Sequence, residues 1–322
     1  MQAATTSRLA LRVHGIEPVA HDTLMFTLLP AEGSTLPPFT AGAHIELQLS
    51  ADLARSYSLL NAPTETHRYQ IAVHRSASSK GGSEYLHRHV QEGQILQSAA
   101  PRNLFALEES ATHSCLIAGG IGITPLMSMA KRLTALGRSW ELHYCARTPA
   151  HAGWMQELTE LAHASGNQVF FHFDEMPDGQ RLDIAQLVQR SIPGTHFYCC
   201  GPSGMLQAFE DATAHCPDRR HVEYFTAKSE AAREGGFELV LSRSGKCLQV
   251  PAGCSILDVV TQAGVDVPTS CREGICGSCE TRIISGEADH RDAVLTPQEQ
   301  ATHTSMMICC SGARSARLVL DL

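Results

Sequence analysis

The sequence predicts a multidomain protein with an N-terminal antiparallel β-barrel, a central doubly wound α/β domain and a C-terminal α+β domain. Three observations predict it. Short alternating segments fill the first third, strands alternate with helices in the middle third, and a cysteine-rich loop lies between strand patterns in the last third. The chain has 322 residues, of which 43% are hydrophobic, so it can bury several cores. We expect domains at 1–110, 111–226 and 236–322, with a linker at 227–235.

Charge and apolar pattern exclude several classes of function. The net charge of −8 argues against a nucleic-acid-binding protein with a broad basic surface. No run of about 18 apolar residues occurs, so no transmembrane helix is expected. Residues 1–13 also lack the continuous apolar core of a secretory signal. From these observations we expect a cytoplasmic protein that binds neither nucleic acid nor membrane. Because the sequence shows no heptads or large apolar repeats, we expect a monomer.

The first third contains a candidate phosphate site. Alternating segments broken by Gly, Pro and Asn predict strands at 9–13, 23–28, 44–49, 69–74 and 94–98. The motif Arg55-Ser56-Tyr57-Ser58 lies within this pattern, and Lys80-Gly81-Gly82-Ser83 opens a helix predicted at 84–90. An arginine beside a glycine-rich helix start is typical of phosphate binding, whereas a tyrosine in a strand is usually a packing residue.

The middle third contains two glycine turns. A strand at 114–118 leads into Gly119-Gly120-Ile121-Gly122-Ile123-Thr124-Pro125, with Thr124 expected as N-cap and Pro125 as the first helical residue. Such a turn offers N–H groups to a diphosphate, although the third glycine of the dinucleotide fingerprint is missing. Strand and helix patterns then alternate at 141–146, 154–164, 168–173, 182–190 and 196–200.

The second glycine turn, Gly201-Pro202-Ser203-Gly204, follows the last of these strands. Ligands of doubly wound sheets bind at the carboxyl ends of the strands, where both turns lie. Arg147 ends the second strand, where the fingerprint prefers an acidic residue for the ribose 2′-hydroxyl. Arg147 could accept a 2′-phosphate or be a solvated charge, so the choice between NADH and NADPH stays open at this point.

The cysteines concentrate the chemistry of the last third. Most of the 12 lie singly in apolar segments and are typical of small buried hydrophobic residues. The set Cys271-x4-Cys276-x2-Cys279, with Cys309 downstream, has the spacing of plant-type [2Fe–2S] proteins. Structural zinc usually takes two short cysteine pairs, and the distal partner here is the doublet Cys309-Cys310. Spacing therefore favours the cluster but does not choose between Cys309 and Cys310.

The flanks of this loop predict a small α+β domain. Strands are expected at 237–241 and 246–250, a helix capped by Ser255 and Asp258, and a closing strand at 316–320. Gly274 and Gly277 allow the loop backbone to approach a cluster closely. Residues 236–322 resemble a plant-type ferredoxin with its β-grasp fold.

Taken in order, five motifs resemble the phthalate dioxygenase reductase family, which includes the vanillate O-demethylase reductase subunits. The resemblance covers essentially the whole chain. The segment 286–292 is also similar to this family rather than to a free plant ferredoxin. The motifs are Arg55-x-Tyr57-Ser58, Gly81-Gly82-Ser83, Gly119-Gly120-x-Gly122-x-Thr124-Pro125, Cys200-Gly201-Pro202 and the cysteine set.

The resemblance implies a flavin barrel, a ferredoxin-NADP reductase-like nucleotide domain and a ferredoxin, and it implies FMN rather than FAD. The isoalloxazine and phosphate would be held by Arg55, Tyr57 and Ser58, and the phosphate also by Gly81, Gly82 and Ser83. Phe225 would cover the flavin ring, although a buried strand-end aromatic explains it equally well.

For the nucleotide, the resemblance implies that Gly120, Gly122 and Thr124 contact the diphosphate of NADH. The turn Cys200-Gly201-Pro202 would lie near the nicotinamide. Family members mostly use NADH, which we expect here despite Arg147. The family pattern also makes Cys309 the fourth cluster ligand, beside Cys271, Cys276 and Cys279.

The function implied is that of a reductase component, which passes electrons from NADH through FMN and a [2Fe–2S] cluster. The family's partner is a terminal oxygenase with a Rieske centre and mononuclear iron, a system of aromatic catabolism. One alternative is a reductase of the same build that serves another acceptor, such as a monooxygenase. A second is a non-catalytic iron–sulfur carrier, which the intact glycine and Arg-x-Tyr-Ser motifs disfavour.

Overall fold

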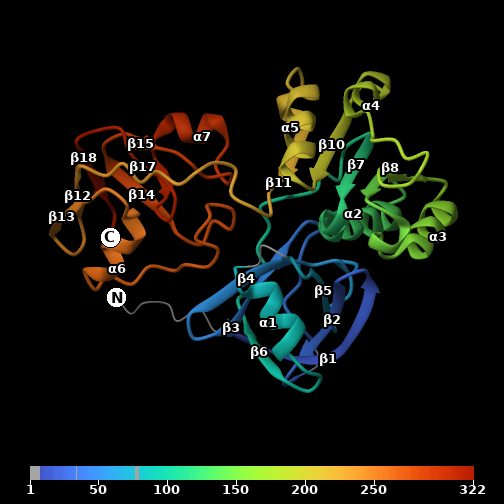
Figure 1. Cartoon of the computed structure of the whole chain (residues 1–322), viewed down its shortest axis with the longest axis horizontal. Helices are drawn as coiled ribbons and strands as arrows, with labels where there is room; N and C mark the ends of the chain where they lie inside the picture. The colour runs from blue at the N-terminus through green and yellow to red at the C-terminus, as the bar shows by residue number, and fades with distance from the viewer. Residues whose placement is uncertain (1–7, 34, 77–79) are drawn as a thin grey trace. The chain divides into compact units, whose positions relative to one another are not determined.

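The computed structural model describes residues 8–33, 35–76 and 80–322 (Figure 1). They divide into two compact units, Met1–Glu223 and Tyr224–Leu322. The first unit holds a six-stranded and a five-stranded sheet, and the second unit holds a five-stranded sheet with a two-stranded one. No helix in the described ranges is both long and apolar enough to cross a membrane.

The N-terminal sheet is antiparallel, with the strand order β4-β3-β6-β1-β2-β5. A hydrogen bond from Leu60 N to Gln70 O, 3.0 Å long, joins the chain after β4 to β5 and draws the two edges of the sheet together. All five predicted strands are present, and β4, which carries the Arg55 motif, is the sixth. The strands are β1 (Leu9–Ala20), β2 (Thr23–Pro30), β3 (His44–Ser50), β4 (Leu53–Ser58), β5 (Tyr69–His74) and β6 (Ile95–Ser98).

Alternating apolar side chains of these strands fill the core of this sheet. Phe26 and Ile45 are fully buried there, and Leu86 of α1 (Gly82–His89) packs into the same cluster. Helix α1 begins two residues before the predicted start at 84. Its glycine-rich start is therefore part of the helix and is held by the core below it.

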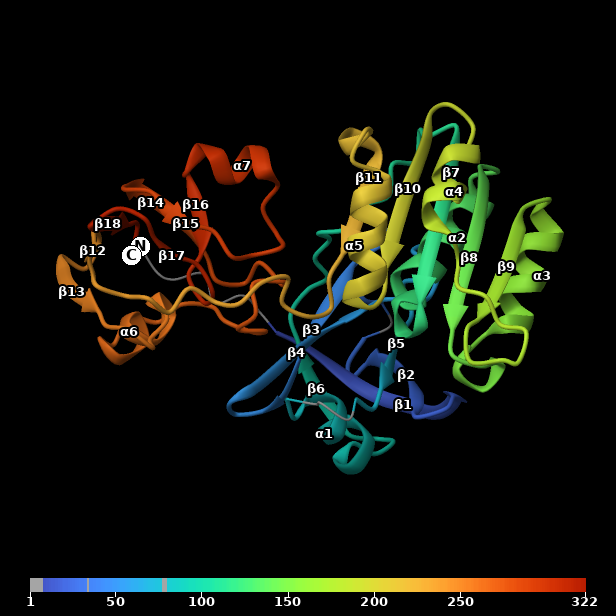
Figure 2. The same ribbon diagram turned by 45° about the horizontal axis from the view of Figure 1, so that its top comes forward.

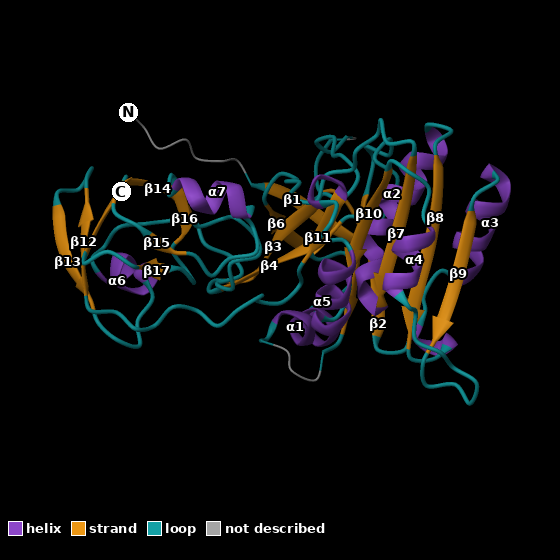
Figure 3. Cartoon of the chain, turned by 90° about the horizontal axis from the view of Figure 1, so that it is seen from above, coloured by secondary structure: helices purple, strands orange, loops and turns teal. Residues whose placement is uncertain are grey.

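The second sheet is entirely parallel, in the order β11-β10-β7-β8-β9, and its arrows point in one direction (Figure 2). Helices flank it (Figure 3), as the alternating pattern predicts for a doubly wound fold. The elements are β7 (His113–Gly119), α2 (Ile123–Ala135), β8 (Ser139–Ala146), α3 (Met155–Ser165), β9 (Gln168–Phe173), α4 (Ile184–Arg190), β10 (Thr195–Cys200), α5 (Ser203–Ala212) and β11 (Arg220–Glu223).

The two faces of this sheet have different partners. Leu142 and Tyr144 of β8 pack with residues of α2 and α3 in one core cluster. Residues of β7 and β8 that alternate with these point to the other face, where a Cβ on Gly119 would lie 3.0 Å from Met205 Sδ of α5. Glu141 and His143 therefore lie on the α5 face.

The C-terminal unit has the mixed sheet order β13-β12-β18-β14-β16. The capping box of Ser255 and Asp258 is present at the start of α6, as predicted. The remaining pair, β15 and β17, forms its own ribbon. The elements are β12 (Phe237–Leu241), β13 (Lys246–Val250), α6 (Ile256–Gln262), β14 (Glu280–Ser285), β15 (Ala288–Asp289), α7 (Pro297–Thr302), β16 (Ser305–Met307), β17 (Gly312–Ala313) and β18 (Arg317–Leu320).

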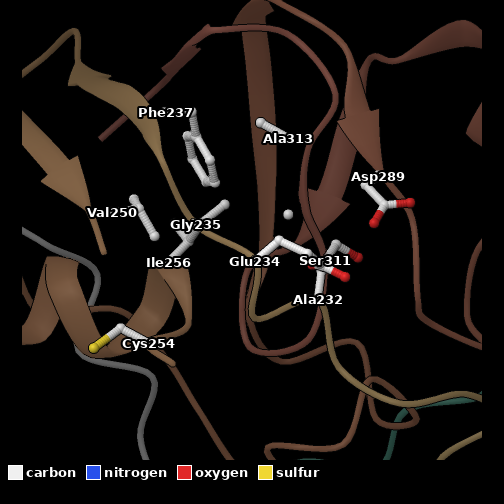
Figure 4. Close-up of a pocket in the computed structure, with 11 residues that line it drawn as sticks. Ala232, Glu234, Gly235, Phe237, Val250, Cys254, Ile256, Asp289, Ser311 and Ala313 are labelled. Carbon is white, nitrogen blue, oxygen red and sulfur yellow. The ribbon is translucent and has the colours of Figure 1, made fainter. Parts of the chain in front are cut away.

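The segment expected as a linker, 227–235, is bonded to this unit. Ser229 Oγ donates to Arg291 O at 2.9 Å, and Ala232 N donates to Cys310 O at 2.8 Å. Around its end lies a cavity of about 20 Å³, room for about one water (Figure 4). Gly235 lines this cavity with φ +61°, and a Cβ there would lie 2.4 Å from the Pro251 carbonyl carbon. The chain therefore enters β12 through a position that only glycine fits.

Candidate functional site

Strand β4 and the start of α1 meet at one point. A Cβ on Gly82 would lie 2.6 Å from Arg55 Cγ and 3.2 Å from Tyr57 Oη, so any side chain there would displace both residues. Arg55 Nη2 donates to Lys80 O at 2.8 Å. The two motifs singled out in the first third thus form one seat, with the guanidinium beside the helix start.

The helix start itself suits an anion. Gly81 is the N-cap residue of α1 and has φ 94°, a left-handed conformation that favours glycine. The first N–H groups of a helix lack intrahelical partners, and the helix dipole adds positive potential there. Together with Arg55, this arrangement fits the phosphate of the expected flavin nucleotide.

Three residues from different strand ends converge near this seat. Ser58 ends β4, Cys200 ends β10 and Glu223 ends β11, and the Glu223 carboxyl is within hydrogen-bond reach of the Cys200 thiol and the Ser58 hydroxyl. Ser58 is 6% exposed and Cys200 is fully buried. Ser58, expected at the flavin, and Cys200, expected near the nicotinamide, are therefore in one cluster, together with a glutamate that we did not predict.

Burial sets the protonation of this cluster. It raises the pKa of Glu223 to about 8, because a buried carboxylate loses hydration. Burial also raises the pKa of the Cys200 thiol well above its usual value, and the neighbouring Glu223 adds to this. At pH 7 both groups are neutral. Glu223 Oε2 is buried without a hydrogen-bond partner among the described residues, which fits a polar group bound beside it.

The two glycine turns of the nucleotide sheet touch each other. A Cβ on Gly122 would lie 2.1 Å from Cys200 O, and one on Gly119 would lie 2.5 Å from Pro202 Cδ. Gly120 has φ +54° and open space on its Cβ side. The turns therefore form one continuous glycine-lined edge at the carboxyl ends of β7 and β10, as predicted for a bound dinucleotide.

The start of α2 differs from the prediction. A short 3₁₀ helix, η1 (Gly120–Gly122), runs directly into α2, so Gly122 is the N-cap residue and the expectation of Thr124 in that position is wrong. Thr124 lies inside the first turn, 2% exposed, and its hydroxyl donates to Ile121 O at 3.0 Å. A contact of Thr124 with a diphosphate stays a prediction.

A cavity of about 640 Å³ opens beside this edge. Its size is typical of a nucleotide-sized ligand. It is lined by both glycine turns and by the side chains of His74 on β5, Arg147 directly after β8, His151 and Arg181. Arg147, the residue that left the choice of coenzyme open, thus faces the cavity wall.

Phe225 lies two residues after Glu223, in the opening residues of the C-terminal unit, and is 36% exposed. Its expected place over a flavin ring stays a prediction.

The cysteine loop has the shape that a cluster needs. Gly274 and Gly277 have φ 70° and 71°, and Arg272 has φ 57°, so the backbone turns back on itself repeatedly. The Cys271 thiol lies within hydrogen-bond reach of the thiols of Cys276 and Cys309, and it accepts a hydrogen bond from Glu273 N at 3.3 Å.

The remaining expected ligand, Cys279, is 4% exposed and ends the same loop. A set of four sulfur donors of this kind suits an iron–sulfur cluster. The geometry fits the group that the spacing predicts.

Cys310 has a different environment. A Cβ on Gly274 would lie 2.4 Å from Cys310 Sγ, so this side chain fills the space behind the loop. Its thiol donates to Met307 O at 3.7 Å. Both contacts suit a packed, protonated cysteine rather than a ligand.

Support for the loop comes from a residue that sequence reasoning missed. Asp292 is 5% exposed and accepts hydrogen bonds from Val294 N and Leu295 N at 3.1 and 2.8 Å. The next residue, Ala293, donates from its N–H to Gly274 O at 2.9 Å. The stretch 286–292 was noticed for its family likeness alone, and nothing in its composition points to this role.

Two family models match separate parts of the chain. The family described as "Oxidoreductase NAD-binding domain" matches residues 116–211, and "2Fe-2S iron-sulfur cluster binding domain" matches residues 239–314.

Whole-chain relatives are similar as well. The chain is 49% identical to phenoxybenzoate dioxygenase subunit beta from Ectopseudomonas oleovorans, over 99% of each chain. It is 42% identical to the phthalate dioxygenase reductase of Burkholderia cepacia, over 98% of this chain and 97% of the relative. A solved phthalate dioxygenase reductase structure, described as a modular structure for electron transfer from pyridine nucleotides to [2Fe-2S], aligns with a TM-score of 0.73. The identity is 41% and the alignment covers 98% of each chain.

The raised pKa of Glu223 predicts a pH-dependent loss of stability. Between about pH 4.5 and 8 the unfolded chain releases this proton and the folded chain keeps it, so the free energy of unfolding falls as pH rises. Glu223→Gln removes the effect. Between pH 5 and 8 we expect the free energy of unfolding of the variant to rise by about 2–4 kcal/mol relative to that of the unmodified protein. Urea unfolding at each pH measures this difference.

Glu109→Gln is the matched control, because the ion pair with Arg132 lowers the pKa of Glu109 and both states are ionised over this range. The difference in free energy of unfolding between Glu109→Gln and the unmodified protein should not change with pH over this range. A flat difference for Glu223→Gln as well would contradict the assignment of a neutral buried carboxyl.

Proposed function

The chain belongs to the phthalate dioxygenase reductase family, and from this premise we propose that it carries electrons from NADH through FMN and a [2Fe–2S] cluster to a terminal oxygenase with a Rieske centre. Family membership makes it an NAD(P)H-dependent flavin and iron–sulfur oxidoreductase. The identity of the flavin, the residues that hold each group and the acceptor are parts of the proposal. One observation carries it. The chain combines two glycine-rich turns suited to phosphate groups with the cysteine set Cys271, Cys276, Cys279 and Cys309.

FMN is favoured over FAD by the resemblance and by the seat on α1. Arg55 and the N–H groups after Gly81 offer a compact site for one phosphate. The flavin, when bound, supplies the conversion of a two-electron hydride donor into a source of single electrons. Arg55, Tyr57 and Ser58 would hold it, with Phe225 against the ring.

The nicotinamide is proposed to lie beside Cys200. Gly122 and Gly201 have no side chains there, so the backbone is accessible to a ligand. The cavity that would hold the diphosphate is lined by Gly119, Gly120 and Pro202. Ser58, Cys200 and Glu223 are neutral and buried, so they exclude water and add no charge next to the hydride path. The transfer needs no acid or base from the chain, and these residues act by position.

Cys271, Cys276, Cys279 and Cys309 are the proposed cluster ligands. The cluster, when bound, accepts and passes one electron at a time. Gly274 and Gly277 keep the loop backbone close to it, and Asp292 with Ala293 braces the loop from behind. These second-layer contacts fix the loop shape and so tune the cluster.

The acceptor is proposed to be a separate oxygenase component in the cytoplasm. None of the 12 cysteines forms a disulfide in the described residues, which suits a reducing compartment. The relative at 49% identity is named as a dioxygenase subunit. A monomeric reductase that binds its oxygenase transiently is consistent with this build.

The proposed function predicts the colour changes of the protein. We expect the purified protein to show flavin and [2Fe–2S] absorption and to bleach in both when NADH is added without oxygen. Flavin released by acid should have the mass of FMN. A protein that carries FAD would overturn the flavin assignment alone, whereas a colourless or zinc-loaded protein without flavin would overturn the whole proposal.

The ligand assignment predicts opposite results at neighbouring cysteines. Cys309→Ser should lose more than about 90% of the cluster absorbance, because an oxygen ligand replaces a thiolate. Cys310→Ser should keep most of it, because its side chain only packs behind Gly274. Iron content per flavin measures both. The reverse pattern would make Cys310 the ligand.

We expect NADH to be preferred over NADPH by at least about tenfold in kcat/KM, measured with cytochrome c or ferricyanide as acceptor. Arg147 is the residue most able to favour a 2′-phosphate, because its side chain lines the cavity at the end of β8. Arg147→Ala should therefore lower whatever activity NADPH supports and leave NADH within about twofold. A preference for NADPH in the unmodified protein would contradict this part of the proposal.

A further inference from the structure

A cysteine, a glutamate and a histidine lie together on the α5 face of the parallel sheet. Cys115 of β7 is the direct register partner of Glu141 of β8, and His143 follows two residues later on the same face. One ligand atom of each residue, a sulfur, an oxygen and a nitrogen, lies within 4.8 Å of the other two. The cluster occupies the strands before their carboxyl ends, away from the glycine turns.

His143 is held as a metal ligand would be. Its Nδ1 lies 3.1 Å from His172 Nε2. In the tautomer in which His143 Nδ1 donates and His172 Nε2 accepts, these two nitrogens form a hydrogen bond. That tautomer leaves the lone pair on His143 Nε2. A histidine that binds a metal usually donates its other ring N–H to a hydrogen-bond acceptor.

The free nitrogen points into the cluster. His143 is 7% exposed, and its Nε2 is buried without a hydrogen-bond partner among the described residues. The nearest carboxylate oxygen, Glu141 Oε2, is 3.8 Å away, which is too long for a hydrogen bond. An unsatisfied buried nitrogen is costly unless something binds it.

Glu141 supplies the negative charge. Its carboxylate lies beside the imidazoles of both His113 and His143. His113 Nε2 lies 3.8 Å from Glu141 Oε1 with its side chain 14% exposed, at the rim of the cluster. It stands where it could complete a fourth position, and water is the other candidate.

We propose that Cys115, Glu141 and His143 bind one divalent transition-metal ion of the zinc class. The mixed sulfur, nitrogen and oxygen donors suit zinc, whereas calcium and magnesium require oxygen ligands. On binding, a bond forms between Cys115 Sγ and the metal, and the thiol proton leaves to solvent. The ion replaces the unsatisfied contacts of a buried polar cluster with coordination bonds, and it ties β7 to β8.

The holoprotein with its flavin and cluster intact provides the test. It is incubated with zinc chloride and passed through a desalting column, and zinc, iron and flavin are then counted by mass spectrometry and absorbance. We expect about one zinc per chain beyond full iron loading, and a higher unfolding temperature with zinc than without it. Iron-replete protein that retains no zinc would overturn the proposal.

Variants locate the ion. Cys115→Ser and His143→Gln should each weaken zinc binding by at least about tenfold in calorimetric titration. Cys199→Ser is the matched control, because Cys199 is fully buried on the next strand, β10, opposite Ile117 of β7. It should bind zinc as the unmodified protein does. Zinc binding that survives His143→Gln, or that is lost equally in Cys199→Ser, would overturn the site, so the outcome does not depend on Cys115→Ser folding.

Discussion

The contact between the two glycine turns is the constraint on which the first unit depends. Gly122 packs against the carbonyl of Cys200 so closely that no side chain fits between them. Gly119 packs against Pro202 in the same way. The contact fixes where β7 and β10 end relative to each other. It thereby sets one wall of the adjacent cavity and holds Cys200 near Glu223 and Ser58. A single methyl group at Gly122 would have to displace the end of β10, which carries Cys200.

Much of the fold was predictable because its elements carry local patterns. The strands at 69–74 and 168–173 and the capping box at Ser255 are found where period and cap residues place them. The start of α2 was not, because the 3₁₀ turn feeds into the helix and shifts the N-cap from Thr124 to Gly122. Small polar residues predict a linker at 227–235, and the structure adds that Ala232 in this segment is buried and bonded to the C-terminal unit.

The candidate site divides in the same way. Glycine turns and cysteine spacing are local motifs, so their residues could be named from the sequence. Glu223 could not, since its importance arises only where three strand ends meet, and no period or spacing records that meeting. Asp292 acts through backbone contacts behind the cysteine loop, which leave no mark in composition. The residues that carry chemistry were therefore easier to find than those that support them.

Burial has a further consequence for the cysteines that bind nothing. The thiolate, not the thiol, reacts with peroxide and electrophiles. Burial raises the pKa of Cys145 to about 12 and raises those of Cys199 and Cys200 as well. These side chains stay protonated and are chemically inert at neutral pH. Buried thiols beside the large cavity are therefore poor nucleophiles, and Cys247 on β13 is the exposed cysteine, the position most open to alkylation or oxidation.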